Sequence, residues 1–538
     1  MPQPPLVVEN LSFRYRDRQG TAIHNISFET KSGEILLIAG ASGCGKTTLI
    51  RCINGLIPRS YKGEKSGRIT VFGEDIKDWP LSRISQKIGT VLQDPERQIL
   101  GTKVLNEVAF GLENLGLPRA EIRERASEAL NFLKISHLQD RETFNISGGE
   151  KQKVALAGVL AMRPSIFLLD EPLASLDPAS AQEALDTIRF LANEGMTVLI
   201  VEHRVEDVLR IQPDRVMFMS DGEIRYLGNL AGLSKVVNYR EVKLPAEEIV
   251  ERARLEPVPE KVRFLPGLEN ISGEKKAIVR FEDVSFGYGA EHEVLHGINL
   301  SVHQGDVIAV LGPNGAGKTT FVKHAIGLLK PKSGRVLVNG RDTREASVAE
   351  IASTLGYVFQ SPSHMLFAPT VREELSFGPA NLRHPKEQIE QEVKEALKTV
   401  NLVENEQDPP LALSFGQQKR VSIAAILAMR SRILVMDEPT AGQDYQNYMN
   451  FMDSILQMPG FEAILFITHD VDLAVIYANR VLIIGDGKLV VDGTPHEALH
   501  DFERLRANRL VPTSLLELNM KRFAETQKFL RAESLAHH

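Results

Sequence analysis

Apolar residues follow two patterns, and both occur in the same order in each half of the chain. Partial alternation of apolar and polar residues over 6–13 and 277–286 predicts half-buried β-strands. Short runs that are apolar throughout, such as 35–39 and 464–467, have the length of strands buried on both faces. Each half is therefore expected to contain a sheet with a buried core.

Predicted helices alternate with these strands. Residues 46–56 and 318–329 follow a buried strand, and residues 104–144 and 371–411 are rich in Glu, Lys, Leu and Ala. Because strands that alternate with helices form mostly parallel sheets, both halves are predicted to be α/β, with the helical inserts as attached subdomains. Further strands are predicted at 166–169, 197–201, 433–436 and 463–467.

One set of motifs occurs twice along the chain. Each set opens with a Gly-rich loop, Gly40–Thr47 or Gly312–Thr319, that fits the pattern Gly-x-x-x-x-Gly-Lys-Thr. The two copies lie 272 positions apart at the lysine (318 minus 46) and 267 apart at later motifs such as Gln93 and Gln360 or Ser147 and Ser414. A period this long indicates a duplicated domain.

The Gly-rich loops predict two phosphate sites. Glycine lets backbone N–H groups turn inward around phosphate oxygens, and the helix that follows adds its positive N-terminus. Lys46 and Lys318 would neutralise β- and γ-phosphate charge, while Thr47 and Thr319 would bind Mg²⁺. The expected nucleotide-binding residues are Gly40, Ser42, Gly43, Gly45, Lys46, Thr47 and Thr48 in the first copy, and Gly312, Asn314, Gly315, Gly317, Lys318, Thr319 and Thr320 in the second.

A pair of adjacent acids follows a buried strand in each half. Four apolar residues lead into Asp170-Glu171-Pro and into Asp437-Glu438-Pro, which places the acids at the C-terminal end of a strand, where α/β sheets hold ligands. Asp170 and Asp437 are predicted to hold Mg²⁺, and Glu171 and Glu438 to position or deprotonate the attacking water. The alternative is an ordinary pair of acids at the end of a strand, and it would be favoured for an Asp-Glu pair that occurred without the other motifs.

A histidine follows a later strand in each half. His203 and His469 lie 32 and 31 residues after the predicted catalytic glutamates (203 minus 171; 469 minus 438). A lone histidine at such a place is more often a hydrogen-bonded strand terminus. Because the spacing nearly repeats, we favour the interpretation that each histidine senses the γ-phosphate.

Composition narrows the functional classes. The 538 residues fit two domains of roughly 230 residues. The net charge of −7, with no Lys/Arg tract, lacks the electrostatic footprint of a nucleic-acid binder. Two cysteines, Cys44 and Cys52, indicate a reducing cytosol. No apolar run reaches the roughly 20 residues that span lipid, so other subunits are expected to do the spanning in any membrane process.

Two further stretches separate this chain from other P-loop proteins. Ser147-Gly-Gly-Glu-Lys and Ser414-Phe-Gly-Gln-Gln resemble Leu-Ser-Gly-Gly-Gln, the signature of ATP-binding-cassette (ABC) ATPases. With the other motifs, the chain resembles a tandem ABC ATPase. The resemblance implies two P-loop domains of the α/β class, each with a mostly parallel core sheet, an N-terminal antiparallel β-subdomain and a helical subdomain. The expected divisions are a first domain at 1–235, a linker at 236–276, a second domain at 277–500 and a C-terminal helical tail at 501–538.

The resemblance also implies how ATP and Mg²⁺ are bound. Two ATPs would lie between halves that pair head to tail, either within one chain or between chains. The first P-loop would then face Ser414, Gly416 and Gln417, and the second would face Ser147, Gly148 and Gly149. Tyr15 and Tyr288 would stack on adenine, and Gln93 and Gln360 would join the nucleotide and its metal to the helical subdomains.

Two residues depart from the signature. Glu150 stands where the family usually has Gln, and Phe415 stands where it has its first Gly. Each could weaken one composite site. Because both glutamates and both histidines are present, we expect two competent but unequal ATP sites.

The stretches after the two glutamines narrow the family further. Residues 93–111 and 360–378 resemble the ATPases of energy-coupling-factor (ECF) importers, which take up vitamins or transition metals. The resemblance implies a peripheral position on the cytoplasmic face of the cell membrane, with two partners: a multispanning membrane subunit and a small substrate-binding membrane subunit. By analogy, a hydroxymethylpyrimidine thiamin precursor is one possible solute. The apolar residues expected to line a groove for a helix of the membrane subunit are Ile99, Leu100, Leu366 and Phe367; the alternative is core packing.

Other classes of tandem cassette protein fit less well. Those that act on ribosomes have a long basic or helical linker, or a Cys-rich iron–sulfur region, whereas this linker is about forty-five residues of mixed charge. DNA-repair cassette ATPases carry a long coiled-coil insertion, and none is visible. The ribosomal class remains the alternative.

Overall fold

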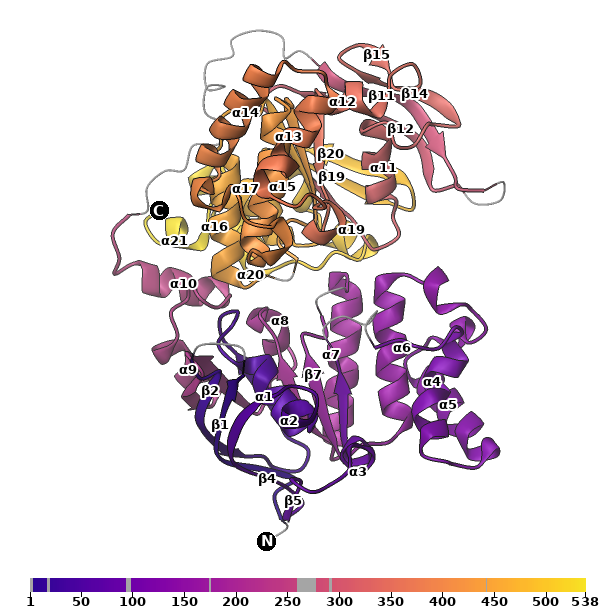
Figure 1. Ribbon diagram of the computed structural model, residues 1–538, viewed down its shortest axis with the longest axis vertical. Helices are drawn as coiled ribbons and strands as arrows, with labels where there is room; N and C mark the ends of the chain where they lie inside the picture. Colours follow the sequence, from indigo (N-terminus) through magenta and orange to yellow (C-terminus); the bar gives the residue numbers. More distant parts are fainter. Residues whose placement is uncertain are drawn as a thin grey trace. The chain divides into compact units, whose positions relative to one another are not determined.

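The chain forms two compact units (Figure 1). The first comprises Met1–Pro245 with Gly442–Gln446, and the second Ala246–Ala441 with Asn447–His538. The computed structural model describes residues 3–16, 20–92, 98–173, 176–258, 277–289, 293–441 and 443–538.

The first unit contains two sheets. Its antiparallel sheet has the order β2-β1-β4-β5, and its six-stranded sheet has the order β10-β9-β3-β8-β7-β6, in which all pairs are parallel except β9 with β10. The strands are β1 (Leu6–Tyr15), β2 (Ile23–Glu29), β3 (Ile35–Ala39), β4 (Gly63–Val71), β5 (Glu74–Asp75), β6 (Ile88–Val91), β7 (Ile166–Asp170), β8 (Thr197–Val201), β9 (Arg215–Ser220) and β10 (Glu223–Gly228).

Helices cover the six-stranded sheet of the first unit. Helices α4 and α5 pack against α6 and form a helical subdomain, visible on one side of the unit in Figure 1. The helices are α1 (Lys46–Ile53), α2 (Leu56–Arg59), α3 (Leu81–Lys87), α4 (Val104–Asn114), α5 (Arg119–Phe132), α6 (Gly148–Ala161), α7 (Pro178–Asn193), α8 (Val205–Leu209) and α9 (Leu230–Val236), with 3₁₀ turns η2 (Ser136–Leu138) and η3 (Thr143–Asn145).

The second unit repeats this arrangement. Its sheets have the orders β12-β11-β14-β15 and β16-β17-β18-β13-β19-β20, and in the second sheet only β19 and β20 pair antiparallel. The strands are β11 (Ala277–Phe286), β12 (Leu295–His303), β13 (Val307–Leu311), β14 (Ser333–Val338), β15 (Arg341–Asp342), β16 (Leu355–Val358), β17 (Ile433–Asp437), β18 (Ala463–Ile467), β19 (Arg480–Gly485) and β20 (Lys488–Gly493).

The helices of the second unit include a helical subdomain and the C-terminal segment. Helices α13 and α14 pack against α15, as α4 and α5 do against α6. The helices are α10 (Ala246–Ala253), α11 (Lys318–Ala325), α12 (Val348–Ala352), α13 (Val371–Asn381), α14 (Lys386–Thr399), α15 (Phe415–Ala428), α16 (Tyr445–Leu456), α17 (Val471–Tyr477), α18 (Pro495–Leu499), α19 (Phe502–Ala507), α20 (Ser514–Thr526) and α21 (Ala532–Leu535), with 3₁₀ turns η4 (Pro362–His364), η5 (Val403–Asn405) and η6 (Pro410–Ala412).

The fold of each unit confirms the α/β architecture predicted from the sequence. The all-apolar strands β3 and β13 are buried at every position and lie inside their sheets, between parallel neighbours. The helices after the Gly-rich loops are shorter than predicted. Gly55 and Gly327 adopt positive φ values of 77° and 73°, a conformation that ends a helix, so α1 stops at Ile53 and α11 at Ala325.

The segment after Pro245 packs on the C-terminal helices of the second unit. Helix α10 contacts α20 and α21, and the Ala246 N–H donates to Ser514 Oγ at 2.8 Å. Arg531 forms an ion pair with Asp453 on α16, and the Tyr477 hydroxyl donates to Asp453 Oδ1 at 2.9 Å. The C-terminal segment is thus part of the packed second unit.

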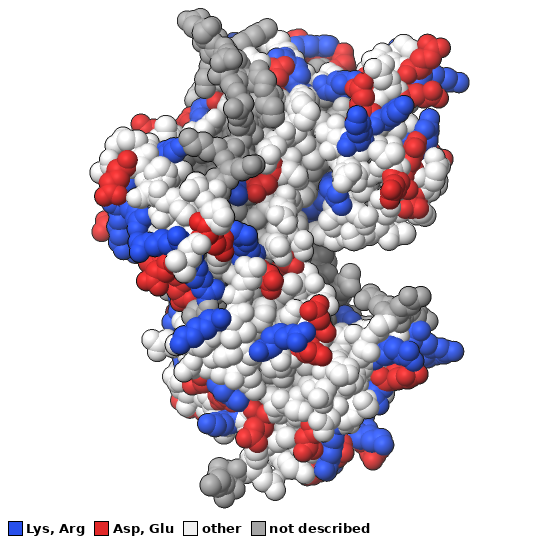
Figure 2. Space-filling view, turned by 90° about the vertical axis from the view of Figure 1, so that its left-hand side faces the viewer, with Lys and Arg blue, Asp and Glu red and all other residues white. Residues whose placement is uncertain are grey.

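The surface carries charge of both signs. On the face in Figure 2, Lys and Arg side chains are interspersed with Asp and Glu, without a continuous basic stripe. Within the described residues, no helix has the length and apolar character needed to cross a bilayer.

The central strand of the first unit yields a stability prediction. Leu36 on β3 is fully buried, so Leu36→Ala leaves a cavity and is expected to lower the free energy of unfolding of this unit by about 2–5 kcal/mol. Trp79, the single tryptophan, is buried in the same core and reports the transition by fluorescence in denaturant. The control Val236→Ala, at a half-exposed position, should shift the transition by less than about 0.5 kcal/mol. Equal shifts for both variants would contradict this account of the core.

Candidate functional site

The Gly-rich loop of the first unit joins β3 to α1. Gly40, Gly43 and Gly45 have φ values of 149°, 82° and 107°, a region that favours glycine. A Cβ at Gly40 would lie 2.2 Å from the Met219 carbonyl oxygen, whereas a Cβ at Gly43 would meet nothing within 4 Å. The loop is therefore packed tightly at its start and open at its tip.

The loop of the second unit has the same geometry. Gly312, Gly315 and Gly317 have φ values of 146°, 82° and 98°, and a Cβ at Gly312 would lie 2.1 Å from the Ile484 carbonyl oxygen. Gly315, like Gly43, faces open space, and its neighbour Asn314 is exposed. Both loops are thus open at Gly43 and Gly315, near the tip.

Each P-loop lysine is buried and bonded to its own loop. Lys46 Nζ donates to the carbonyl oxygens of Gly40 and Ala41, both at 2.8 Å. Lys318 Nζ donates to Gly312 at 2.8 Å and to Pro313 at 2.9 Å. The loop therefore holds each ammonium group near the place that phosphate oxygens would take.

In each unit, the threonine and the aspartate that the sequence predicts to bind Mg²⁺ lie next to each other. Thr319 Oγ1 donates to Asp437 Oδ2 at 3.1 Å, and Thr47 Oγ1 lies 3.5 Å from Asp170 Oδ1, at the limit of a hydrogen bond. The described residues contain no cluster of three or more His, Cys, Asp or Glu side chains that could bind a metal. One hydroxyl and one carboxylate fit a Mg²⁺ site that phosphate oxygens and water complete.

Burial changes the pKa of both aspartates. Desolvation, with the neighbouring Glu171 charge second, raises the pKa of Asp170 to about 6. Burial also raises the pKa of Asp437, although the Tyr357 hydroxyl, which donates to Asp437 Oδ2 at 2.7 Å, opposes this. Because burial disfavours the charged form of these carboxylates, a cation bound at their oxygens would stabilise that form.

The glutamates and histidines that the sequence predicts to be catalytic contact each other in both units. Glu171 Oε1 lies 2.8 Å from His203 Nε2, and Glu438 Oε1 lies 2.9 Å from His469 Nδ1. The two units therefore present different ring nitrogens to the acid. All four side chains are largely buried.

The signature residues begin a helix in each unit. Ser147 and Ser414 cap α6 and α15 through capping boxes, in which Glu150 and Gln417 bond back to the serine N–H at 2.7 Å and 3.0 Å. Glu150, the departure from the signature, thus completes the cap as Gln417 does. An acid suits a helix N-terminus because the helix dipole is positive there.

The other predicted nucleotide contacts lie beside the loops or outside the described residues. Tyr15 and Tyr288 each place their hydroxyl 3.2 Å from a threonine of the helix after the P-loop, Thr48 and Thr320. Gln360 is exposed, two residues after β16. The position of Gln93 lies outside the described residues.

Two residues at these sites were not predicted from the sequence. Glu202, which precedes His203, is buried and accepts from the Leu173 N–H at 2.9 Å and from the His203 N–H at 3.2 Å. Burial raises the pKa of Glu202 to about 8. Tyr357 is the other. The sequence hints at Tyr357 only by its place near the end of β16, the strand that pairs with β17, where Asp437 lies.

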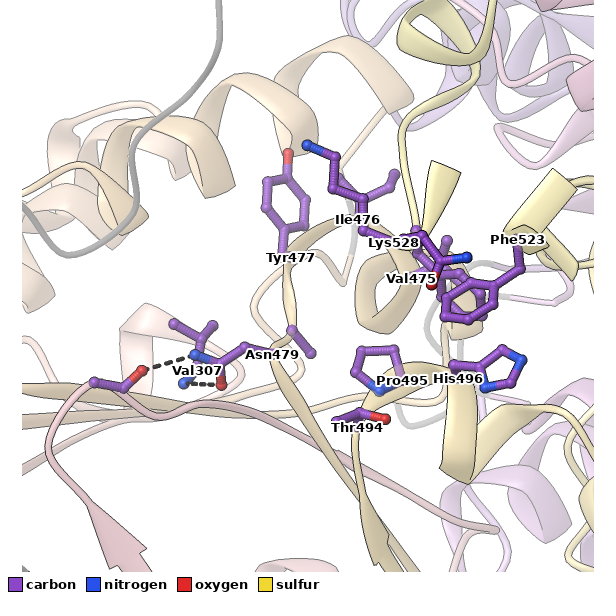
Figure 3. Close-up of a pocket in the computed structure, with 14 residues that line it drawn as sticks. Val307, Val475, Ile476, Tyr477, Asn479, Thr494, Pro495, His496, Phe523 and Lys528 are labelled. Carbon is purple, nitrogen blue, oxygen red and sulfur yellow. Dashed lines mark hydrogen bonds between the residues drawn. The ribbon is translucent and has the colours of Figure 1, made fainter. Parts of the chain in front are cut away.

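A separate cavity of about 530 Å³ lies in the second unit, between the start of β13, the end of α17 and the C-terminal helices (Figure 3). His496 stacks on Phe523 at 3.7 Å between ring centroids, and Lys528 lines the same space. None of the predicted nucleotide-binding or catalytic residues lines it. We therefore place the chemistry at the P-loops.

The ABC transporter family profile matches residues 23–174 and 295–441, together more than half of the chain. The chain belongs to the ABC transporter family. It carries two ABC ATPase domains in tandem, and ATP binding with Mg²⁺ and ATP hydrolysis are properties of the family. The tandem ABC ATPase recognised in the sequence is thereby confirmed.

Proteins similar along the whole length carry the same description. The ABC transporter ATP-binding protein TTE1589 of Caldanaerobacter subterraneus subsp. tengcongensis is 37% identical, with 98% of each chain covered. A protein of the same description from Methanosarcina mazei is 34% identical, with 98% of this chain and 97% of the other covered. Among solved structures, CbiO1 from Clostridium perfringens, part of the ABC transporter complex CbiONQ, is 31% identical; the match covers 49% of this chain and 99% of that chain, with a TM-score of 0.38.

Glu202 of this ABC ATPase yields a prediction about pH. Because its pKa is raised from 4.5 to about 8, the folded state binds a proton there that the unfolded state loses between these values, and stability falls as the pH rises through this window. Glu202→Gln cannot ionise. The melting temperature of Glu202→Gln relative to the parent, followed by Trp79 fluorescence, should therefore increase from pH 5 to pH 8.

The control for this prediction is Glu64→Gln, which removes an exposed carboxylate of the same unit. Its effect on the melting temperature should be small throughout. A difference between Glu202→Gln and the parent that does not change with pH would contradict the assignment.

Proposed function

We propose that this chain is the ATP-hydrolysing subunit of an importer of the ECF type. It would couple ATP hydrolysis to uptake of a vitamin or a metal ion through separate membrane subunits. The observation that carries the proposal is an exposed apolar loop that both units present at the same place, in the stretches that resemble ECF ATPases.

The apolar loop residues point to a protein partner. Leu100 is 70% exposed in the first unit and Phe367 is 63% exposed in the second. Each is followed by an exposed phenylalanine on the next helix, Phe110 on α4 and Phe377 on α13. The rings of Phe367 and Phe377 meet edge to face, with 4.8 Å between their centroids. Exposed apolar side chains that gather in this way mark interaction sites.

A buried carboxylate holds each apolar loop in place. Glu107 Oε2 accepts from the N–H groups of Leu100 and Gly101 at 2.8 Å and 2.6 Å. Glu374 Oε2 accepts from those of Phe367 and Ala368 at 2.9 Å and 2.8 Å. The display of Leu100 and Phe367 is therefore fixed by charge-assisted hydrogen bonds, as a preformed docking surface requires.

The groove differs in one residue from the sequence prediction. Leu366 was expected to line it beside Phe367, but Leu366 is buried in the core of the second unit and cannot contact a partner. Leu366 follows the turn η4, which ends at His364, and it packs inward whereas Phe367 stays exposed. The prediction for Leu366 is therefore wrong, and Phe377 supplies the second apolar surface instead.

The catalytic residues have defined tasks in this proposal. Mg²⁺ held by Thr47 and Asp170 would neutralise charge on the phosphates. Glu171 would orient the attacking water and accept its proton, and His203, 2.8 Å from Glu171, would hold the carboxylate toward the γ-phosphate. Thr319, Asp437, Glu438 and His469 would act likewise in the second unit. We further propose, on the family resemblance, that ATP draws the halves together and that hydrolysis releases them.

The two ATP sites are expected to contribute unequally. The histidine contacts the glutamate through Nε2 in the first unit and through Nδ1 in the second, and among the described residues a tyrosine hydroxyl donates to Asp437 but not to Asp170. Glu171→Gln and Glu438→Gln should therefore reduce steady-state ATP hydrolysis to different extents, each by roughly tenfold or more at its own site. Identical losses in a phosphate-release assay would count against unequal sites.

The apolar loops yield a prediction about the partner. Leu100→Asp and Phe367→Asp should reduce recovery of membrane subunits with the tagged chain, because a charge replaces an apolar contact, while ATP hydrolysis by the isolated chain changes less than about twofold. The control Phe190→Asp alters a similarly exposed ring, on α7. Recovery that falls equally with Phe190→Asp would argue against a specific docking loop.

A pull-down from native membranes tests the whole proposal. Recovery of a multispanning membrane protein with a small solute-binding membrane protein would support the ECF type and point to the solute. Recovery of ribosomal proteins without membrane proteins would overturn it in favour of a translation factor.

A further inference from the structure

A buried lysine of the second unit has no role in the functions described so far. Lys419 lies on α15, one turn after Phe415, and its side chain is 1% exposed. Burying an ammonium group is costly unless polar or aromatic groups replace water around it. Its contacts therefore indicate what holds it there.

Three contacts surround the Lys419 ammonium. Nζ donates to the carbonyl oxygen of Pro439, the residue after Glu438. It lies 5.0 Å from the centre of the Phe415 ring and 5.6 Å from that of Phe451 on α16, within the range of cation–π attraction. Lys419 thus connects the signature turn and α16 to the turn that carries the catalytic acid.

The first unit lacks all three parts of this arrangement. At the equivalent positions, each 267 earlier, it has Gly148 for Phe415, Gln152 for Lys419 and Ala184 for Phe451. Gln152 is also buried, yet neither polar atom of its amide has a hydrogen-bond partner among the described residues. The cation and both rings are therefore present together in one unit and absent together from the other.

The turn after the catalytic acid needs an anchor in both units. Glu171 and Glu438 have φ values of 50° and 45°, which are strained for a residue with a side chain. In the first unit, buried Glu202 accepts from the Leu173 N–H in this turn. In the second unit, Thr468 stands at the position of Glu202 and accepts instead from the Asp470 N–H at 3.0 Å. Lys419 supplies an anchor through the carbonyl oxygen of Pro439.

We propose that Lys419 is the positioning residue for Glu438, and that Phe415 and Phe451 shield its ammonium group. The bond to Pro439 would hold the strained turn so that the Glu438 carboxylate stays fixed against His469. The contact with Lys419 would then explain why phenylalanine stands at position 415 in place of the signature glycine. The proposal rests on the catalytic role proposed above for Glu438. Burial lowers the pKa of Lys419 to about 7, with the Glu438 charge acting in the other direction.

Amide hydrogen exchange tests the anchor without relying on hydrolysis. The N–H groups of Glu438 and Ala441 are bonded to the carbonyl oxygens of Ile467 and Glu438 at 2.9 Å and 3.1 Å. Lys419→Met keeps the length of the side chain and removes the charged donor, so exchange of these amides should accelerate about tenfold in the full-length chain. Unchanged exchange in Lys419→Met would overturn the proposal.

The first unit provides the matched control for exchange. Gln152→Met alters the equivalent buried position, where no hydrogen bond exists to be lost, and exchange in the Glu171 turn should change less than twofold. Acceleration of the same size in both units would show that any change at this helix position loosens the turn. That result would also overturn the proposal.

ATP hydrolysis then tests the consequence for catalysis. With Glu171→Gln, turnover depends on Glu438, and adding Lys419→Met should lower kcat roughly tenfold to a hundredfold while KM for ATP changes less than about twofold. With Glu438→Gln, adding Lys419→Met should have no effect. Equal losses in both backgrounds would overturn the positioning role. If Glu171→Gln alone abolishes turnover, the catalytic role of Glu438 fails, and hydrogen exchange still decides whether Lys419 anchors the turn.

Discussion

The backbone reversal at Glu171 and Glu438, to which we assign the catalytic role, is the constraint on which both proposed sites depend. A buried parallel strand ends at Asp170 or Asp437, and the next residue adopts a positive φ while its N–H remains bonded to the neighbouring strand, at Val201 or Ile467. This reversal directs the two adjacent acids to different places: the aspartate lies against a P-loop threonine and the glutamate against a histidine. A strained turn persists only where surrounding contacts determine it.

The two units meet this constraint in different ways. A buried carboxyl group, that of Glu202, holds the turn in the first unit, whereas the buried side chain of Lys419 contacts it in the second. The duplicated scaffold, with its P-loops and Glu–His pairs, is the same in both. Duplication therefore kept the reacting groups and changed the residues that support them, which gives a physical basis for sites of unequal activity.

Buried side chains also support the surface that we assign to the membrane partner. Buried Glu107 and Glu374 bind pairs of loop N–H groups and so fix the exposed apolar residues next to them. A fixed loop loses little conformational entropy when a partner binds. The apolar loops and the turns that follow Asp170 and Asp437 are thus each contacted by a buried ionisable side chain.

The sequence by itself determined the α/β class, the duplication, the P-loops, the acid pairs and the histidines, because these depend on local pattern and on residue types at fixed spacing. It could not show that Leu366 is buried while Phe367 is exposed, since neighbouring apolar residues look alike until the core is packed. Nor could it give a role to Glu202, Tyr357 or Lys419. Their partners lie 29, 80 and 20 residues away, and only tertiary packing brings such groups within hydrogen-bond distance.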